Sequence, residues 1–167
     1  MVNNVDNLAL KALSQALKLE REGREFYLKA ATMSFGEKGK AMFLSLADDE
    51  QKHADMVTRQ LHAIEGEGAY VVLPLGNVPD IDLDAKLFPP DPNRIERKIG
   101  SDPTEIDALH VALEMEIRSY DLYRLAARGA TDEAGRQMYQ WLTSAEMTHF
   151  NLLMLNYESI ASGGGWV

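Results

Sequence analysis

The sequence contains no cysteine. This absence excludes disulfides, thiolate zinc sites, iron–sulfur clusters and thiol nucleophiles. Any bound metal must therefore be held by carboxylate oxygens and imidazole nitrogens.

Long apolar runs and basic residues are also scarce. No run approaches the roughly 18–20 apolar residues of a membrane span, and Met1 to Leu10 lack the basic and apolar regions of a secretory signal. The chain has 17 Lys and Arg against 26 Asp and Glu, a net charge of −9, which argues against a nucleic-acid or anionic-membrane surface. We therefore expect a cytoplasmic protein with neither kind of partner, folded as a single domain over residues 1–167.

The chain repeats itself. A shift of 96 residues places positions 12–64 on positions 108–160 without a gap, with 15 identities over 53 positions. A shared bias towards alanine and leucine explains many of these matches. It does not explain four others: Glu20 with Glu116, Tyr27 with Tyr123, Glu50 with Glu146, and His53 with His149.

Each repeat has the periodicity of a helical hairpin, with apolar residues at spacings of three, four and seven. We predict helices near residues 4–33, 36–65, 104–129 and 132–161, so the hairpins cover 4–65 and 104–161. Capping signals at Ser34 and at Asp102-Pro103, and glycines at Gly66 and Gly129, support these limits. Residues 66–103 hold all six prolines and form a long crossover. The tail, residues 162–167, is expected to be frayed.

Two short motifs point to a metal centre. Glu50 and His53, three residues apart, share one helix face, and the second repeat carries the same pair. A single Glu-x-x-His is commonly a solvated face, but here each copy is accompanied by a core-facing glutamate on the preceding helix. One Glu from each of two helices and Glu-x-x-His from the other two is the pattern of di-iron and di-manganese carboxylate proteins. The predicted ligands are Glu20, Glu50, His53, Glu116, Glu146 and His149.

Other residues near these motifs leave alternatives open. Tyr27 and Tyr123 lie nearly two turns after the first glutamate of each repeat, so each could hydrogen-bond a ligand carboxylate across the bundle or simply pack in the core. Asp49 could accept a proton from the free nitrogen of His149, whereas the equivalent position of the other repeat is Ala145. His62 and His110 lack such partners and are expected on the surface. Without metal, the four carboxylates should raise one another's pKa.

The arrangement Glu20…Glu50-Gln-Lys-His53…Glu116…Glu146-Met-Thr-His149, with Tyr27 and Tyr123, resembles the rubrerythrin branch of the ferritin-like superfamily. The resemblance implies an all-α, ferritin-like four-helix bundle that forms homodimers and reduces hydrogen peroxide at a di-iron centre. It also implies that Glu50 and Glu146 bridge the metals, that Glu20 and Glu116 are terminal ligands, and that each histidine binds one ion. Iron is the expected metal, with manganese or zinc as alternatives.

Two departures from the rubrerythrin pattern affect the expected activity. Many rubrerythrins carry a four-cysteine iron domain as electron source, and this chain has no cysteine. They also place a further glutamate where this chain has Ser119. We therefore expect an oxidoreductase that reacts with peroxide or dioxygen and takes electrons from an external donor. The alternatives are a ferritin-like storage protein, a hydroxylase of a quinone or other organic substrate, and a structural metal site.

Overall fold

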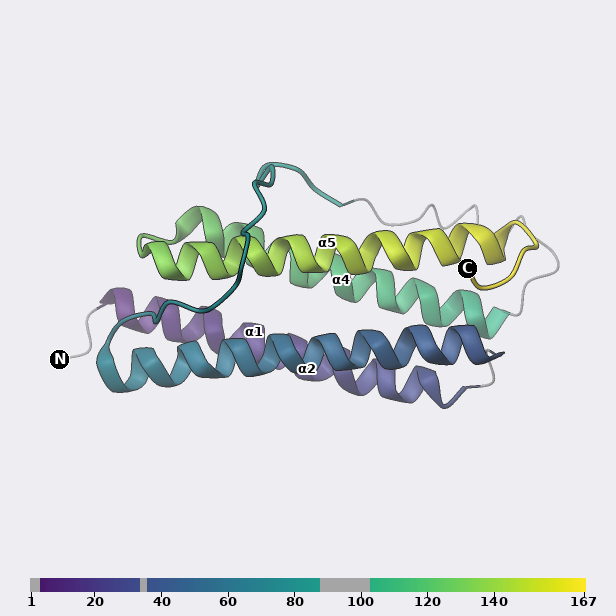
Figure 1. The fold of residues 1–167 in the computed structure, drawn as a ribbon, viewed down its shortest axis with the longest axis horizontal. Coiled ribbons are helices and arrows are strands. Elements are labelled where there is room, and N and C mark those ends of the chain that lie inside the picture. The colour runs from purple at the N-terminus through teal and green to yellow at the C-terminus, as the bar shows by residue number, and fades with distance from the viewer. Residues whose placement is uncertain (1–3, 34–35, 88–102) are drawn as a thin grey trace.

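The computed structural model describes residues 4–33, 36–87 and 103–167. This part of the chain contains four helices and no strand, an all-α ferritin-like four-helix bundle (Figure 1). Their limits agree with the predicted ones to within about two residues. The helices are α1 Asn4–Ala31, α2 Gly36–Glu67, α4 Pro103–Gly129 and α5 Glu133–Ala161.

The helices form two antiparallel hairpins stacked as two layers (Figure 1). α1 packs on α2, α4 packs on α5, and α1 also contacts α4 across the layers. α2 and α4 start at the same end of the bundle and run in the same direction, as Figure 1 shows. The connection between them must therefore span the length of the bundle, which explains why the segment 66–103 is long.

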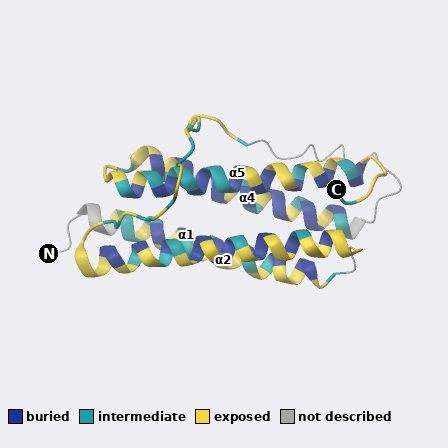
Figure 2. Cartoon of the chain, in the orientation of Figure 1, coloured by how far each residue is buried: buried dark blue, intermediate teal, exposed yellow. Residues whose placement is uncertain are grey.

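The apolar stripes predicted from the periodicity face the interior, as the buried faces in Figure 2 show. The buried residues form two apolar clusters, one towards each end of the bundle. Phe43, Leu109 and Leu153 belong to the first cluster. Leu13 and Leu142 belong to the second. Burying each such side chain stabilises the fold by roughly 1.5–3 kcal/mol, so both ends hold the helices in register around the middle.

The first part of the crossover is fastened to the bundle. Gly68, with φ 72°, allows the left-handed turn that ends α2, two residues after the predicted end at Gly66. The Gln60 amide then brackets the backbone of Val71: its Nε2 donates to Val71 O at 2.7 Å, and Val71 N donates to its Oε1 at 2.9 Å. The Tyr70 and Tyr139 hydroxyls lie 3.1 Å apart, which ties this segment to α5.

The tail, residues 162–167, is packed and not frayed as the sequence suggested. Trp166 Nε1 donates to Glu105 Oε1 at 2.6 Å, and its ring stands edge-on to Phe43 with 5.7 Å between centroids. Val167 N donates to Asn156 Oδ1 at 2.9 Å. The tail is held because burial of a large aromatic ring and a backbone hydrogen bond offset the entropy of ordering a few residues.

The packed tail is the counterpart of the segment after α2. Gln60 and Asn156 are 96 residues apart, and each fastens the residue eleven positions later, Val71 and Val167 respectively. Tyr70 and Trp166 are also 96 residues apart, and each places its aromatic ring against the second helix of the other hairpin. The internal repeat therefore extends beyond residue 64 to residues 71 and 167. We call residues 68–71 and 164–167 the two straps.

The structure describes how α4 and α5 begin. Pro103 is the first residue of α4, as predicted. Asp132 caps α5 by accepting a hydrogen bond from Gly135 N. Ser34 and Asp102 lie outside the described residues. None of the described helices combines the length and apolar character that a membrane span needs.

Replacing Trp166 with alanine should lower the free energy of unfolding by about 1–3 kcal/mol, because the ring contact with Phe43 and the hydrogen bond to Glu105 are both lost. Urea denaturation followed by circular dichroism measures this change. Val167→Ala is the control, since its side chain is 59% exposed and its backbone bond to Asn156 is retained. Equal stability of Trp166→Ala and the unmodified protein would contradict a packed tail.

Candidate metal centre

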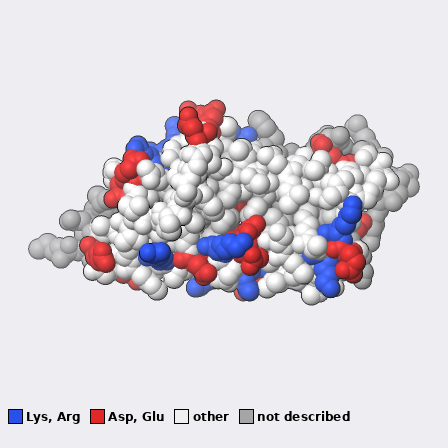
Figure 3. Space-filling view, viewed as in Figure 1, with Lys and Arg blue, Asp and Glu red and all other residues white. Residues whose placement is uncertain are grey.

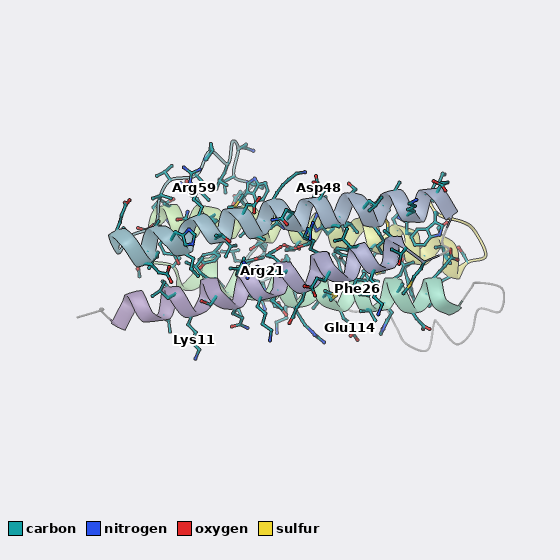
Figure 4. The ribbon with its side chains drawn as sticks, turned by 90° about the horizontal axis from the view of Figure 1, so that it is seen from below. Lys11, Arg21, Phe26, Asp48, Arg59 and Glu114 are labelled. Carbon is teal, nitrogen blue, oxygen red and sulfur yellow. The ribbon has the colours of Figure 1, made fainter. Side chains whose placement is uncertain are left out.

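The six predicted ligand residues meet near the middle of the bundle, between the two apolar clusters. All six are buried, with exposed fractions between 0% and 6%. By contrast, the labelled charged side chains of Lys11, Arg59 and Glu114 are exposed on the outer faces of the helices (Figure 4). The buried set comes from all four helices: Glu20 from α1, Glu50 and His53 from α2, Glu116 from α4, and Glu146 and His149 from α5.

Both histidines turn Nδ1 towards the carboxylates. His53 Nδ1 lies 3.3 Å from Glu20 Oε2 and 3.2 Å from Glu146 Oε1. His149 Nδ1 lies 3.3 Å from an oxygen of Glu50. The ligand atoms form two overlapping groups whose members lie within 4.8 Å of one another. These groups are Glu20, Glu50, His53 and Glu146, and Glu50, Glu116, Glu146 and His149.

The donor atoms fit a pair of divalent cations. Several buried atoms of this cluster make no hydrogen bond with acceptable geometry to any described residue. Each such atom costs roughly 1–3 kcal/mol if it stays unsatisfied. Two cations among carboxylate oxygens and imidazole nitrogens would satisfy all of them at once. The atoms are Oε2 of Glu20, Oε2 of Glu116, both carboxylate oxygens of Glu146, and Nδ1 of His53 and His149.

Two tyrosines orient the outer carboxylates across the interface between α1 and α4. The Tyr27 hydroxyl donates to Glu116 Oε1, and the Tyr123 hydroxyl donates to Glu20 Oε1. Both rings are fully buried in the apolar clusters. Of the two roles that the sequence left open, hydrogen bonding and core packing, each tyrosine fills both. Because Oε1 is held by the phenol, Oε2 of each carboxylate is the oxygen left for the centre.

The two halves of the cluster differ at their outer edges. His149 Nε2 lies 3.6 Å from Asp49 Oδ2, slightly beyond hydrogen-bond distance but close enough for attraction to an imidazolium. His53, on the other side, faces the ring of Trp141 edge-on at 5.7 Å. The remaining two histidines stay outside the cluster: His62 is exposed, and the side chain of His110 is 28% exposed beside Glu114.

Charges within the metal-free cluster are balanced by protons. Burial, reinforced by the charge of Glu146, raises the pKa of Glu20 and Glu116. Burial alone would lower the pKa of the two histidines, but the negative carboxylate oxygens close to each Nδ1 raise it.

The histidines lower the pKa of Glu146 and Glu50 despite their burial. The charge of Glu146 raises the pKa of Glu50 as expected, but the net pKa of Glu50 and of Glu146 is lowered, because contacts with neighbouring side chains outweigh burial and repulsion.

Comparison with known proteins agrees with this geometry. The family model described as Rubrerythrin matches residues 11–157, which is most of the chain. The chain belongs to the rubrerythrin family. No curated protein and no solved structure matched the chain. The part matched by the rubrerythrin model includes all six residues of the cluster and both tyrosines, Tyr27 and Tyr123.

This rubrerythrin-family chain has a cavity of about 200 Å³ beside the cluster. Glu50, Glu116 and Tyr27 line it, together with Gly23 and Ser119, which occupy equivalent positions of the two repeats. A Cβ added to Gly23 would lie 3.5 Å from the Glu50 carboxylate, so glycine keeps this side of the carboxylate open. The sequence analysis missed Gly23. Its position could have indicated its role, because Gly23 lies one helical turn after Glu20, just as Ser119 lies one turn after Glu116.

Glu20→Gln and Glu146→Gln should both impair metal binding, but they should change the free energy of unfolding of the metal-free protein by different amounts. Gln resembles a protonated Glu20, so the free energy of unfolding of Glu20→Gln should lie within about 1 kcal/mol of that of the unmodified protein. Glu146 is ionised between two imidazoliums, so the second should lose about 1–3 kcal/mol. Urea unfolding at neutral pH in the presence of a chelator compares them. Equal losses would show that both glutamates have the same charge in the metal-free protein.

Metal binding should release protons, because Glu20, Glu116 and both histidines must lose theirs to become ligands. The affinity for Zn²⁺, a redox-inert probe, should therefore rise with pH through the neutral range, with about two ions bound per chain. Calorimetric titration in buffers of different ionisation enthalpy counts the protons. His62→Ala, outside the cluster, should behave as the unmodified protein, whereas binding without proton release would contradict the assigned protonation.

Proposed function

We propose that the protein is a di-iron oxidoreductase that reduces peroxide or dioxygen with electrons from an external donor. The observation that carries this proposal is the buried cluster of four glutamates and two histidines at the centre of a rubrerythrin-family bundle. A structural site needs no cavity beside its ligands, but here a cavity of about 200 Å³ reaches Glu50 and Glu116.

The two overlapping groups of ligand atoms support a specific ligation. Glu50 and Glu146 belong to both groups and would bridge the ions. Glu20 and His53 would complete one site, and Glu116 and His149 the other. Iron is favoured because carboxylate oxygens stabilise its ferric state, while manganese and zinc suit the same donor atoms. Bound iron would supply the redox chemistry that the side chains lack.

The protein side chains would admit, orient and protonate the oxidant. The small cavity fits peroxide or dioxygen and excludes most larger molecules. Tyr27 lines this cavity and its hydroxyl donates a hydrogen bond to Glu116, so its phenol proton would lie close to an oxidant in the cavity. The small side chains of Gly23 and Ser119 leave room in the cavity. Because Ser119 has no carboxylate, the chemistry would depend on the six ligands and not on a seventh.

Two other functions compete with this one. A hydroxylase would need room for an organic substrate next to the metals, and a cavity of about 200 Å³ is small for that purpose. Iron storage without turnover needs a large closed shell, so a shell-sized particle in solution would favour it. We propose a homodimer, supported by exposed apolar side chains on the α1 and α4 pair, among them Leu28 and Val111.

We propose that the protein acts in the cytoplasm and that its remaining partners are small molecules. The net charge of −9 and the interspersed acidic and basic side chains on the face shown in Figure 3 do not favour nucleic acid or an anionic membrane. The external donor is needed because the chain holds no cysteine that could bind an iron centre of its own.

Stopped-flow oxidation of the anaerobically reconstituted Fe(II) protein tests the proposal. Peroxide or dioxygen should oxidise the bound Fe(II) at least about tenfold faster than free Fe(II), because the ligands hold it open to a small oxidant. Glu50→Ala is the control without a bridging carboxylate and should lose this advantage. If neither oxidant reacts faster than with free Fe(II), the proposed activity is wrong. Elemental analysis of the protein as isolated identifies the metal.

A further inference from the structure

Three tyrosines connect the metal cluster with a pocket at the end of the bundle where α2 and α4 finish. Tyr123 donates its hydroxyl to Glu20, and its ring stacks on Tyr139 with 6.2 Å between centroids. Tyr139 in turn meets Tyr70 edge-on, again with 6.2 Å between centroids, and their hydroxyls lie 3.1 Å apart. Tyr123 is fully buried, Tyr139 is 2% exposed, and Tyr70 is half-buried. The row therefore leads stepwise from the centre to the surface.

The internal repeat provides a second row that differs in composition. Adding 96 relates Tyr27 to Tyr123, Phe43 to Tyr139 and Tyr70 to Trp166. Tyr27 donates to Glu116 and stacks on Phe43 at 6.0 Å, and Phe43 meets Trp166 at 5.7 Å. Packing is thus matched in both rows, so shape alone does not require a tyrosine at position 139. A phenylalanine has no phenol proton and is much harder to oxidise, so only the first row can pass single electrons readily.

The tyrosine row ends in a pocket of about 400 Å³, a volume typical of small-molecule sites. Tyr70 and Tyr139 line it together with apolar residues that include Ile64, Leu125 and Ala126. Among the described residues that line the pocket, Asp132 is the one carboxylate and no side chain is cationic. A carboxylate without a cation disfavours anionic ligands, while apolar walls and two phenol hydroxyls favour a neutral aromatic molecule.

We propose that this pocket binds a small neutral aromatic reductant of the hydroquinone class, and that Tyr70, Tyr139 and Tyr123 pass its electrons to the metal cluster. This inference rests on the proposed function, since it supplies the external electrons which that function requires. It assigns the donor's chemical class and its place of entry. It also explains why one repeat has a tyrosine where the other has Phe43.

Electrons and protons balance for this route. Hydroquinone loses two electrons and two protons and becomes quinone. Peroxide takes up two electrons and two protons, its O–O bond breaks, and two waters form. Each electron crosses the row in single steps: an oxidised tyrosine is reduced by its neighbour and recovers its phenol proton from its hydrogen-bond partner. For Tyr123 that partner is Glu20. An oxidised Tyr139 instead takes an electron and a proton together from the Tyr70 hydroxyl 3.1 Å away, and Tyr70 takes both back from hydroquinone.

Binding can be measured without metal. Hydroquinone, titrated anaerobically into the metal-free protein, should bind in the pocket, and hydroquinone sulfonate should bind at least about tenfold more weakly because of its charge. Ala130→Trp fills the pocket from the loop between α4 and α5, where Ala130 is not one of the six predicted ligand residues, and should abolish binding. Binding that is equal in Ala130→Trp, or equal for the two ligands, would overturn the pocket assignment.

Electron transfer is tested by re-reduction of the iron protein after oxidation with one equivalent of peroxide. Tyr139→Phe copies the packing of the other row but removes one of the two phenols that line the pocket, so re-reduction is compared at hydroquinone concentrations that saturate each protein. Re-reduction by hydroquinone should slow by about tenfold or more. Tyr120→Phe is the matched control, because it removes a buried phenol on α4 whose hydroxyl donates to Ala85 O, and it should re-reduce at the normal rate.

A spectroscopic readout separates transfer from a structural effect. A second equivalent of peroxide, added to the Fe(III) protein without donor, can take one electron and one proton from each of two tyrosines and become two waters. Freeze-quench electron paramagnetic resonance should then show a tyrosyl radical whose hyperfine pattern or yield changes in Tyr139→Phe and not in Tyr120→Phe. Normal re-reduction of Tyr139→Phe, or an unchanged radical, would overturn the route while leaving the proposed function intact. Failure of the unmodified Fe(II) protein to react with either peroxide or dioxygen faster than free Fe(II) would instead remove the proposed function itself.

Discussion

The structure depends on one electrostatic constraint: four carboxylates and two imidazoles share a dry space in the middle of a helical bundle. Such a set can exist only if its charge is cancelled within the space. Divalent cations can do this, and protons can do it in their absence, since the pKa values of Glu20, Glu116 and both histidines are raised while those of Glu50 and Glu146 are lowered. The apolar clusters at both ends supply the stability that allows the centre to be assembled for chemistry.

The fold and the meeting of the six predicted ligand residues could be predicted because both halves of the chain carry the same pattern. Periodicity shows which face of a helix is buried, and the matched Glu-x-x-His motifs show which buried residues belong together. Periodicity cannot show which atom of a side chain meets which partner. The bonds from Tyr27 to Glu116 and from Tyr123 to Glu20 depend on how α1 lies against α4. The charge states were mispredicted for a similar reason, since they depend on distances between imidazole and carboxylate on different helices.

The positions at which the two repeats differ are as informative as those at which they agree. The shared residues build a symmetric frame. Asp49 stands opposite His149 whereas the other histidine meets Trp141, and Gly23 opens beside Glu50 where the second repeat has Ser119. A symmetric pair of ions would thus sit in unequal surroundings. Unequal surroundings allow one ion to face the incoming oxidant while the other faces the protein.

The two straps divide the molecule into equivalent modules. Residues 1–71 hold one hairpin, three of the six ligand residues, one tyrosine that reaches across to the other half, and the amide of Gln60 that fastens the segment leaving α2. The second half repeats this plan through Asn156 and Val167. Each half therefore supplies one complete face of the centre. In evolutionary terms, such a layout is what fusion of two copies of a self-associating hairpin would leave behind.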